Sequence, residues 1–154
     1  MIQITQCQTD DDLREIRVLF GEYIESLGFH LSFQDVEAEL AELPGRYSPP
    51  EGRLLLARHD GATAGCVAMK KLGEGVCEMK RFFVRPTFRG KGIGAALARA
   101  IVSEGRSAGY RSMRLDTVPS MKSAINIYEG LGFRDAEPYV FNPVAGARYL
   151  ELIL

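Results

Sequence analysis

A short glycine-rich loop at residues 89–94 is the stretch of this sequence best suited to binding a phosphate group. Its three glycines occupy every second position, and Arg89 and Lys91 add positive charge. Glycine lets backbone N–H groups approach a ligand because no Cβ stands in the way. A strand pattern precedes the loop and a helix pattern follows it. The first N–H groups of a helix have no partner within the helix and carry partial positive charge, so the loop predicts a phosphate site.

A dinucleotide is one alternative ligand. Gly90-x-Gly92-x-x-Ala95 fits the dinucleotide-binding fingerprint, and Asp116 follows about 20 residues later at the end of an expected strand. That fingerprint normally follows its strand directly, whereas residues 86–89 intervene here, so this alternative is the weaker one. A P-loop is excluded because Lys91 is followed by glycine rather than by Ser or Thr.

The composition is that of an ordinary soluble globular protein, with 46% hydrophobic and 25% charged residues. A length of 154 residues suits one core, so we expect residues 1–154 to form a single domain. The formal net charge of -1 provides no overall field to attract nucleic acid or an anionic membrane. We therefore expect neither as a partner.

Cysteine usage and hydropathy indicate a cytoplasmic protein. No apolar run reaches the roughly 18–20 residues of a membrane span, and residues 1–7 are too polar for a signal peptide. The three cysteines, Cys7, Cys66 and Cys77, form no CxxC pair and leave one unpaired. That pattern favours a reducing compartment and no metal site.

The N-terminal part of the chain predicts a weak strand over residues 2–7 and then two helices. Thr9, with Asp12 three residues later, is typical of a helix start. Apolar residues recur at helical spacing as far as Gly28, which ends the helix. A second helix is expected over 32–43, with Pro44 after it.

The middle of the chain predicts an antiparallel meander of three strands, over 53–59, 63–72 and 76–84. Asp60-Gly61 is typical of a hairpin turn. A helical pattern over 92–108 and a strand over 112–117 follow, which makes a right-handed crossover between parallel strands. A further helix over 119–131 and a closing hairpin over 139–154 complete the chain. The predicted fold class is α/β (α+β), a mixed sheet with helices on both faces.

The sequence resembles the GNAT family, the Gcn5-related N-acetyltransferases. Residues 89–94 match the family's R/Q-x-x-G-x-G/A signature, and they follow a strand that ends in Phe82-Phe83-Val84. Residues 124–133, with Tyr128 before a Gly-Phe step, are similar to the family's second motif. The resemblance covers nearly the whole chain with order and spacing intact.

The resemblance implies a site for acetyl-CoA. The loop would bind the pyrophosphate, and the strand before it would offer backbone groups to the pantetheine arm as an added strand. In the family this strand and the next one splay apart to leave a gap for the thioester. Met121 stands where many members carry Asn, and Asn126 lies on a different face of the same helix. The cofactor-binding candidates are Phe82, Phe83, Val84, Arg89, Gly90, Lys91, Gly92, Ile93, Gly94 and Asn126.

The resemblance also implies two catalytic residues, Tyr128 and Glu78. Acetyl transfer needs a neutral amine, a polarised carbonyl and a protonated thiolate. A phenol with a pKa of about 10 can donate to the departing thiolate, which suits Tyr128. Glu78 lies where some members place a catalytic glutamate, although it could instead pair with Lys80 or Arg81.

The predicted function is acetyl-CoA-dependent N-acetyl transfer to a primary amine on a small molecule or a peptide. A non-catalytic acyl-CoA-binding sensor of the same fold is the alternative. Candidate walls of the acceptor site are Tyr23, Phe29, His30 and the loop at Asn142. Family members are often homodimers, and the sequence leaves both the acceptor and the oligomeric state open.

Overall fold

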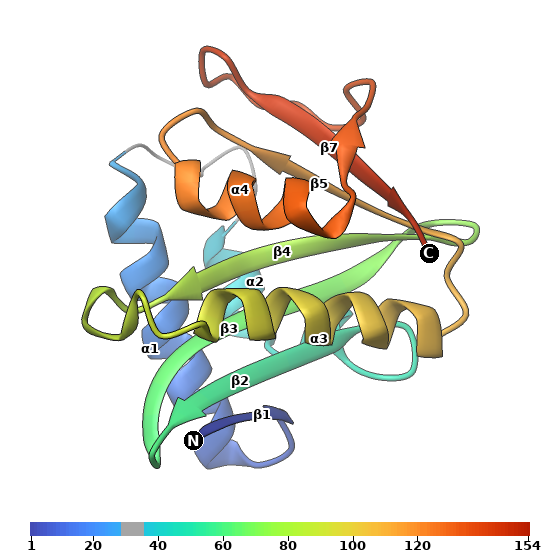
Figure 1. Ribbon diagram of the computed structural model, residues 1–154. Coiled ribbons are helices and arrows are strands. Elements are labelled where there is room, and N and C mark those ends of the chain that lie inside the picture. The colour runs from blue at the N-terminus through green and yellow to red at the C-terminus, as the bar shows by residue number, and fades with distance from the viewer. Residues whose placement is uncertain (29–35) are drawn as a thin grey trace.

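A seven-stranded mixed sheet forms the centre of the protein, with strand order β1-β2-β3-β4-β5-β7-β6 (Figure 1). The computed structural model describes residues 1–28 and 36–154. The strands are β1 (Ile2–Gln6), β2 (Arg53–His59), β3 (Ala62–Gly73), β4 (Val76–Val84), β5 (Ser112–Thr117), β6 (Arg134–Asp135) and β7 (Arg148–Ile153). The helices are α1 (Asp10–Leu27), α2 (Val36–Glu42), α3 (Ile93–Ser107) and α4 (Lys122–Leu131), with short 3₁₀ turns η2 (Gly45–Tyr47) and η3 (Pro86–Phe88).

Helices cover both faces of the sheet, as the sequence predicts. In Figure 1, α3 and α4 lie in front of the sheet and α1 and α2 lie behind it. Each face has its own apolar core, one containing Leu97 and Ile101 of α3 and the other containing Leu19 and Phe20 of α1. Because both faces are covered, the central strands are buried on both sides.

Helix α1 begins and ends where the sequence predicts. Thr9 accepts a hydrogen bond from the backbone N–H of Asp12, and the Asp12 side chain accepts one from the backbone of Thr9, which makes a capping box. Gly28 ends the helix with φ of 71°. The start of the second predicted helix lies outside the described residues, and α2 ends at Glu42, just before Pro44.

The antiparallel meander is also confirmed. Asp60 and Gly61 have φ values of 50° and 85° and connect β2 to β3 in a tight hairpin turn. The ladder between β3 and β4 shifts register between Cys66 and Ala68, opposite Arg81, whose φ is 57°. This irregularity is a bulge, which re-aims the side chains that follow it.

The parallel crossover joins β4 to β5 through α3, and the two strands pair only at their beginnings. Val76, Cys77 and Glu78 face Ser112, Met113 and Arg114. Beyond Glu78, β4 continues to Val84 and β5 to Thr117 without ladder pairing between them. Figure 1 shows the two strands diverging toward their carboxyl ends, so the fold contains the gap that the resemblance implies.

The predicted closing hairpin is wrong in its first arm. Strand β7 pairs with β5 on one side and with the two-residue β6 on the other, so its partner precedes the predicted arm. The stretch from 137 to 147 contains no strand. Pro138 and Pro143 lack the N–H group that a ladder requires, which explains why this stretch stays irregular.

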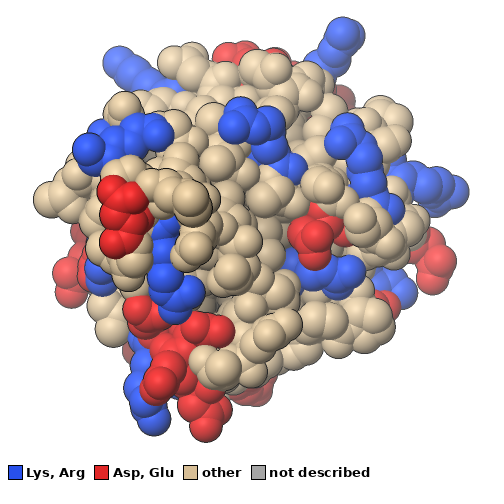
Figure 2. All heavy atoms as spheres, turned by 60° about the horizontal axis from the view of Figure 1, so that its bottom comes forward, with Lys and Arg blue, Asp and Glu red and all other residues tan. Residues whose placement is uncertain are grey.

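On the face shown in Figure 2, Lys and Arg side chains are scattered, and several acidic side chains gather at the lower left. Within residues 1–28 and 36–154, no helix is long and apolar enough to cross a membrane.

Candidate active site

A groove of about 630 Å³ lies between the end of β4 and the first turns of α3 and α4. Six segments line it: the end of α1, the end of β4, the turn η3, the glycine-rich loop, the start of α3, and α4 with the two residues before it. The groove has the size of a cofactor site. Its lining residues are Ser26, Leu27, Phe82, Phe83, Val84, Pro86, Phe88, Arg89, Gly90, Gly92, Ile93, Gly94, Ala95, Ser120, Met121, Lys122, Ser123, Ala124 and Ile127.

The glycines of the loop serve two different purposes. Gly90 and Gly92 have φ values of 80° and 83°, a conformation that L side chains rarely adopt. Gly92 stands at the N-cap of α3, and no side chain caps the helix there. Gly94 is needed for packing instead, because a Cβ there would lie 3.1 Å from Cδ1 of Ile127 on α4. The first N–H groups of α3 are therefore left to a ligand in the groove.

The two predicted cations are placed differently. Arg89 lines the groove, and its Nε donates a hydrogen bond to the carbonyl oxygen of Val84 at 3.2 Å. Lys91 is exposed and is not part of the groove lining. The arginine is thus the better oriented of the two toward an anion in the groove.

Asn126 is exposed on α4 and does not line the groove, whereas Lys122 and Ser123 of the same helix do. The sequence analysis missed both of these residues. The expected helix start near Ser120 could have indicated them. Residues in the first turn of a helix lie close to a ligand that binds at its N-terminus. Met121, at the position where the family often has Asn, also lines the groove.

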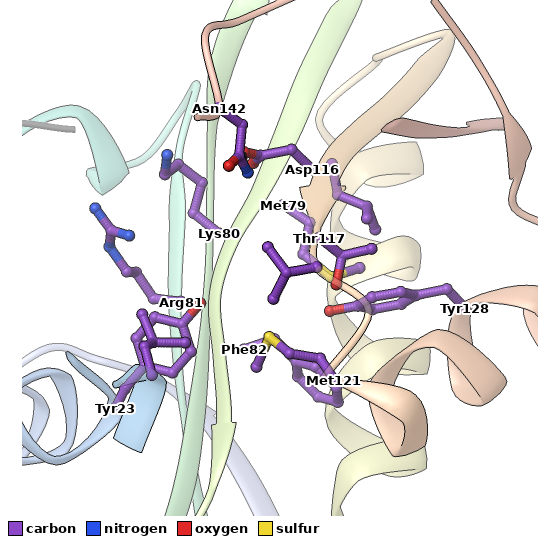
Figure 3. A pocket seen from close by; sticks show the side chains of 13 residues that line it. Tyr23, Met79, Lys80, Arg81, Phe82, Asp116, Thr117, Met121, Tyr128 and Asn142 are labelled. Carbon is purple, nitrogen blue, oxygen red and sulfur yellow. Dashed lines mark hydrogen bonds between the residues drawn. The ribbon is translucent and has the colours of Figure 1, made fainter. Parts of the chain in front are cut away.

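A second, smaller cavity of about 50 Å³ occupies the gap between β4 and β5 (Figure 3). It shares Leu27, Phe82 and Met121 with the groove, so the two cavities adjoin. Its other lining residues are Tyr23, Met79, Lys80, Arg81, Leu115, Asp116, Thr117, Val118, Tyr128 and Asn142.

Tyr128 lines the small cavity and packs against Phe82, which lines both cavities. Its ring packs against Phe82 and Phe133 with centroid distances of 5.7 Å and 5.8 Å. Its hydroxyl points into the gap (Figure 3). Burial raises the pKa of the Tyr128 phenol far above its ordinary value, so the hydroxyl stays protonated and acts as a hydrogen-bond donor.

Glu78 lies deeper than a residue that meets solvent or substrate directly. Only 1% of it is exposed, and it lines neither cavity. Its Oε2 accepts a hydrogen bond from the Tyr139 hydroxyl at 2.7 Å, and its Oε1 lies 3.7 Å from Nζ of Lys70. Arg81 pairs instead with Glu39, at 2.7 Å.

The side of the gap that faces α1 and α2 carries the charged side chains of the small cavity. Figure 3 shows Lys80 and Arg81 on this side of β4, with Asp116 and Asn142 above them. Burial lowers the pKa of the Lys80 ammonium, and the carboxylates nearby oppose that shift. Tyr23 and Asn142, two of the residues predicted as walls of the acceptor site, line this cavity. Phe29 and His30 lie outside the described residues.

The protein has free thiols. Cys7, Cys66 and Cys77 are all unpaired, and burial raises the pKa of the Cys7 thiol to about 11. Among the residues that the structure describes, no group of three or more His, Cys, Asp or Glu side chains could hold a metal ion.

The mixed sheet, whose parallel strands part beside a glycine-rich helix start, is the arrangement that the resemblance to N-acetyltransferases implies. The model of the acetyltransferase (GNAT) family matches residues 14–133, and the chain belongs to that family. It is 40% identical to an uncharacterized N-acetyltransferase of Schizosaccharomyces pombe over 98% of this chain and 94% of the relative. An uncharacterized N-acetyltransferase of Dictyostelium discoideum is 28% identical over 84% of this chain and 88% of that protein.

Solved structures agree on the fold. A GNAT-family acetyltransferase from Staphylococcus aureus superposes with a TM-score of 0.80 at 18% identity, covering 98% of both chains. The PaiA N-acetyltransferase of Thermoplasma acidophilum, solved in complex with coenzyme A, gives a TM-score of 0.75 at 16% identity and covers 100% of this chain and 99% of that one. The family match and the relatives make the chain an acetyl-CoA-dependent N-acetyltransferase, and the solved structures add that the fold agrees.

Proposed function

We propose that the protein transfers the acetyl group by direct attack of a primary amine on the thioester held in the gap between β4 and β5. One observation carries this proposal: the small cavity in the gap adjoins a cofactor-sized groove, and the Tyr128 hydroxyl points into the gap. Each reactant then has its own approach, and the two approaches meet beside Phe82 and Tyr128. Direct attack needs only that both reactants be held close together in the correct orientation.

The donor would be held mainly by backbone groups. We place the pyrophosphate at the N-terminus of α3, where Gly92, Ile93 and Gly94 line the groove. The pantetheine arm would run along residues 82–84 of β4. These residues form no ladder pairs with β5, so their backbone groups on that side would be open to the arm. A backbone N–H group near Phe82 would then polarise the thioester carbonyl.

The amine nitrogen forms a bond to the carbonyl carbon, the C–S bond breaks, and the sulfur leaves as a thiolate. The Tyr128 hydroxyl donates a hydrogen bond to that thiolate. Because its pKa is raised, complete proton transfer from the phenol to a thiolate, whose conjugate acid has a pKa of about 8.5, is uphill. The proton that the nitrogen loses after attack therefore completes the thiol.

An acceptor ammonium must first lose a proton, and Glu78 stays our predicted general base for that step. An amine with a pKa near 10 is mostly protonated at neutral pH, which adds roughly 4 kcal/mol to the barrier. The position of Glu78 limits the route by which it could take this proton. Since it lines neither cavity and accepts a hydrogen bond from Tyr139, it would take the proton through that hydroxyl or through water.

The acceptor is proposed as a primary amine on a small molecule or a peptide, and the site of action as the cytoplasm. The three free cysteines support a reducing compartment. A relative from Danio rerio is named N-acetylaspartate synthetase; it is 31% identical over 76% of this chain and 43% of its own length. That name adds amino acids to the acceptors worth testing.

The decisive experiment measures free thiol released from acetyl-CoA in the presence of a panel of primary amines, amino acids and peptides. We expect at least one acceptor to raise thiol release well above the rate of hydrolysis without acceptor. Gly92→Val, which removes the proposed donor site, should release none. Binding of acetyl-CoA without turnover on any amine would contradict the proposal and favour a sensor of the same fold.

A further inference from the structure

Three apolar side chains line both the groove and the small cavity, and they form the passage between the two. Leu27 is the last residue of α1, Phe82 belongs to β4, and Met121 comes directly before α4. Figure 3 shows Phe82 and Met121 at the same end of the small cavity. Since the thioester is proposed to lie in this gap, its acyl group would lie against these three side chains.

Met121 is held at the passage by its backbone. Its N–H donates to the carbonyl oxygen of Val118, and its own carbonyl oxygen accepts from the N–H of Ile125, both at 3.0 Å. The residue is the N-cap of α4, and its side chain makes no capping hydrogen bond. The Asn that the family often has here is a good N-cap, whereas the sulfur of Met is a weak acceptor. The Met121 side chain therefore acts at the passage by its size and its apolar character.

The apolar wall of the small cavity belongs to the interior of the protein. Met79, Leu115 and Val118 line the cavity and are only 3%, 2% and 4% exposed. Met79 and Leu115 pack in the same apolar core as Leu97 and Ile101. A core at this density resists expansion, because an extra methylene forces side chains out of their preferred rotamers. A longer acyl chain gains no room on this side.

The opposite part of the small cavity is charged and polar. Lys80, Arg81 and Asp116 line it, and Nδ2 of Asn142 donates to Oδ2 of Asp116 at 3.0 Å. A hydrocarbon tail that reached these groups would displace water from them and offer no hydrogen bond in return, which costs free energy. Polar groups therefore oppose a longer tail in one direction, and the buried core opposes it in the other.

We propose that Met121 sets the length of the acyl chain that the protein accepts, an inference that rests on the proposed function. A cavity of about 50 Å³ has room for roughly two or three non-hydrogen atoms, and the acceptor nitrogen takes one of these places. The acyl groups that fit are acetyl and, at most, propionyl. Butyryl and longer groups need the space that the Met121 side chain fills at the passage.

Two unreactive derivatives of coenzyme A test this limit without knowledge of the acceptor. S-ethyl coenzyme A has the length of acetyl-CoA, and S-butyl coenzyme A has the length of butyryl-CoA. Isothermal titration of both gives the length preference, the dissociation constant of the butyl compound divided by that of the ethyl compound. We expect a length preference of at least about tenfold for the wild-type protein, the usual penalty for methylenes that a pocket does not accommodate.

Variants then assign the length preference to one side chain. Met121→Ala should reduce it to about twofold or less, because truncation leaves a space that the longer chain can fill. Met121→Leu nearly conserves the volume and should keep the wild-type preference. Ile127→Ala is the matched control, because Ile127 lines the groove but not the small cavity. It should weaken the binding of both compounds alike and leave their ratio unchanged.

The opposite outcomes are equally distinct. A wild-type protein that binds both compounds equally well would overturn the inference and leave the proposed function standing. A length preference that survives Met121→Ala, or that Ile127→Ala removes as well, would also overturn it. If neither compound binds to the wild type, the donor groove is wrong and the proposed function itself fails. Should Met121→Ala fail to fold, the smaller truncation Met121→Val decides: the inference predicts a preference reduced about threefold, and an unchanged preference would contradict it.

Discussion

The two cavities beside the gap differ in what they offer a ligand. The groove proposed for the donor, about 630 Å³, is built around the end of β4 and the glycine-rich start of α3, where backbone groups would meet the ligand. The small cavity proposed for the acceptor, about 50 Å³, has charged and polar side chains from α1, β4, β5, α4 and the loop before β7 among its lining residues. Backbone recognition suits a donor common to a whole family, whereas side chains adapt one member to its acceptor. Changes on the donor side should therefore affect binding, and changes on the acceptor side should affect turnover and selectivity.

The largest effect should come from Gly92→Val. A valine Cβ would meet no protein atom within 4 Å, but φ of 83° is strained for a β-branched residue, and the side chain would stand at the groove. We expect acetyl-CoA affinity to fall by more than about a hundredfold, equivalent to roughly 3 kcal/mol. Isothermal titration measures this.

Gly109→Val is the matched control. Gly109 lies just after the other end of α3, has φ of 90°, and likewise has no protein atom within 4 Å of an added Cβ. It carries similar backbone strain without touching the groove. The two variants should melt at similar temperatures but differ in affinity. Equal affinities would show that the loop does not hold the donor.

Tyr128→Phe should have the next largest effect. Loss of the hydroxyl should lower kcat about a hundredfold while KM for acetyl-CoA changes little, because the hydrogen bond forms as the thiolate leaves. The raised pKa of the phenol keeps it protonated as pH rises, so its ionisation should not lower wild-type kcat below pH of about 10. Steady-state kinetics across pH measure both.

Tyr110→Phe controls for the loss of any tyrosine hydroxyl. The Tyr110 hydroxyl donates to the carbonyl oxygen of Glu51 at 2.6 Å and lines neither cavity. The kcat of the Tyr110→Phe variant should stay within about twofold of the wild-type value. If the Tyr128→Phe variant had the same kcat as this control, Tyr128 would contribute to packing and not to catalysis.

A moderate effect is expected on the acceptor side from Glu78→Gln. If Glu78 takes the amine proton through Tyr139, Glu78→Gln and Tyr139→Phe should each lower kcat about tenfold. The double variant should be no slower than either one, because both changes interrupt the same relay. Additive losses, or full activity in Tyr139→Phe beside an inactive Glu78→Gln, would exclude that relay.

The smallest effects on acetyl-CoA affinity are expected from single substitutions of the other cofactor-binding candidates. Arg89→Ala should weaken acetyl-CoA binding about tenfold, because Arg89 lines the groove and its hydrogen bond to Val84 orients it. Lys91→Ala should weaken it only about twofold, and less at high salt, as for an exposed charge. Asn126→Ala should leave it unchanged. A larger loss for Lys91 or Asn126 than for Arg89 would contradict this order.

The same contrast explains what could be predicted from the sequence. The donor groove depends on local features: glycine spacing at 89–94 and the helix that begins directly after it. The strand before the loop and Tyr128 in a helical motif were likewise visible from neighbouring residues. The meander followed from short hairpin turns such as Asp60-Gly61, and the structure confirms it.

The acceptor cavity depends on contacts between distant segments. Tyr139 reaches Glu78 across 61 residues, and Asn142 reaches Asp116 across 26. Neither contact leaves a periodic pattern in the sequence. From the sequence, Asp116 is only a potential ribose ligand of a dinucleotide, because no local signal shows that β4 and β5 separate after Glu78. The sequence predicts Tyr139 in the first arm of a hairpin and Asn142 in its turn, whereas the structure has no strand from 137 to 147.

The most direct test of this account is a titration of isotope-labelled protein with coenzyme A, followed by the amide signals of each residue. Donor recognition by backbone groups predicts the largest shifts at Gly90, Gly92, Ile93 and Gly94, with smaller ones along residues 82–84. The signals of Asp116 and Asn142 should move little, because coenzyme A lacks the acceptor. Shifts concentrated around Asp116, or absent from the start of α3, would contradict the account.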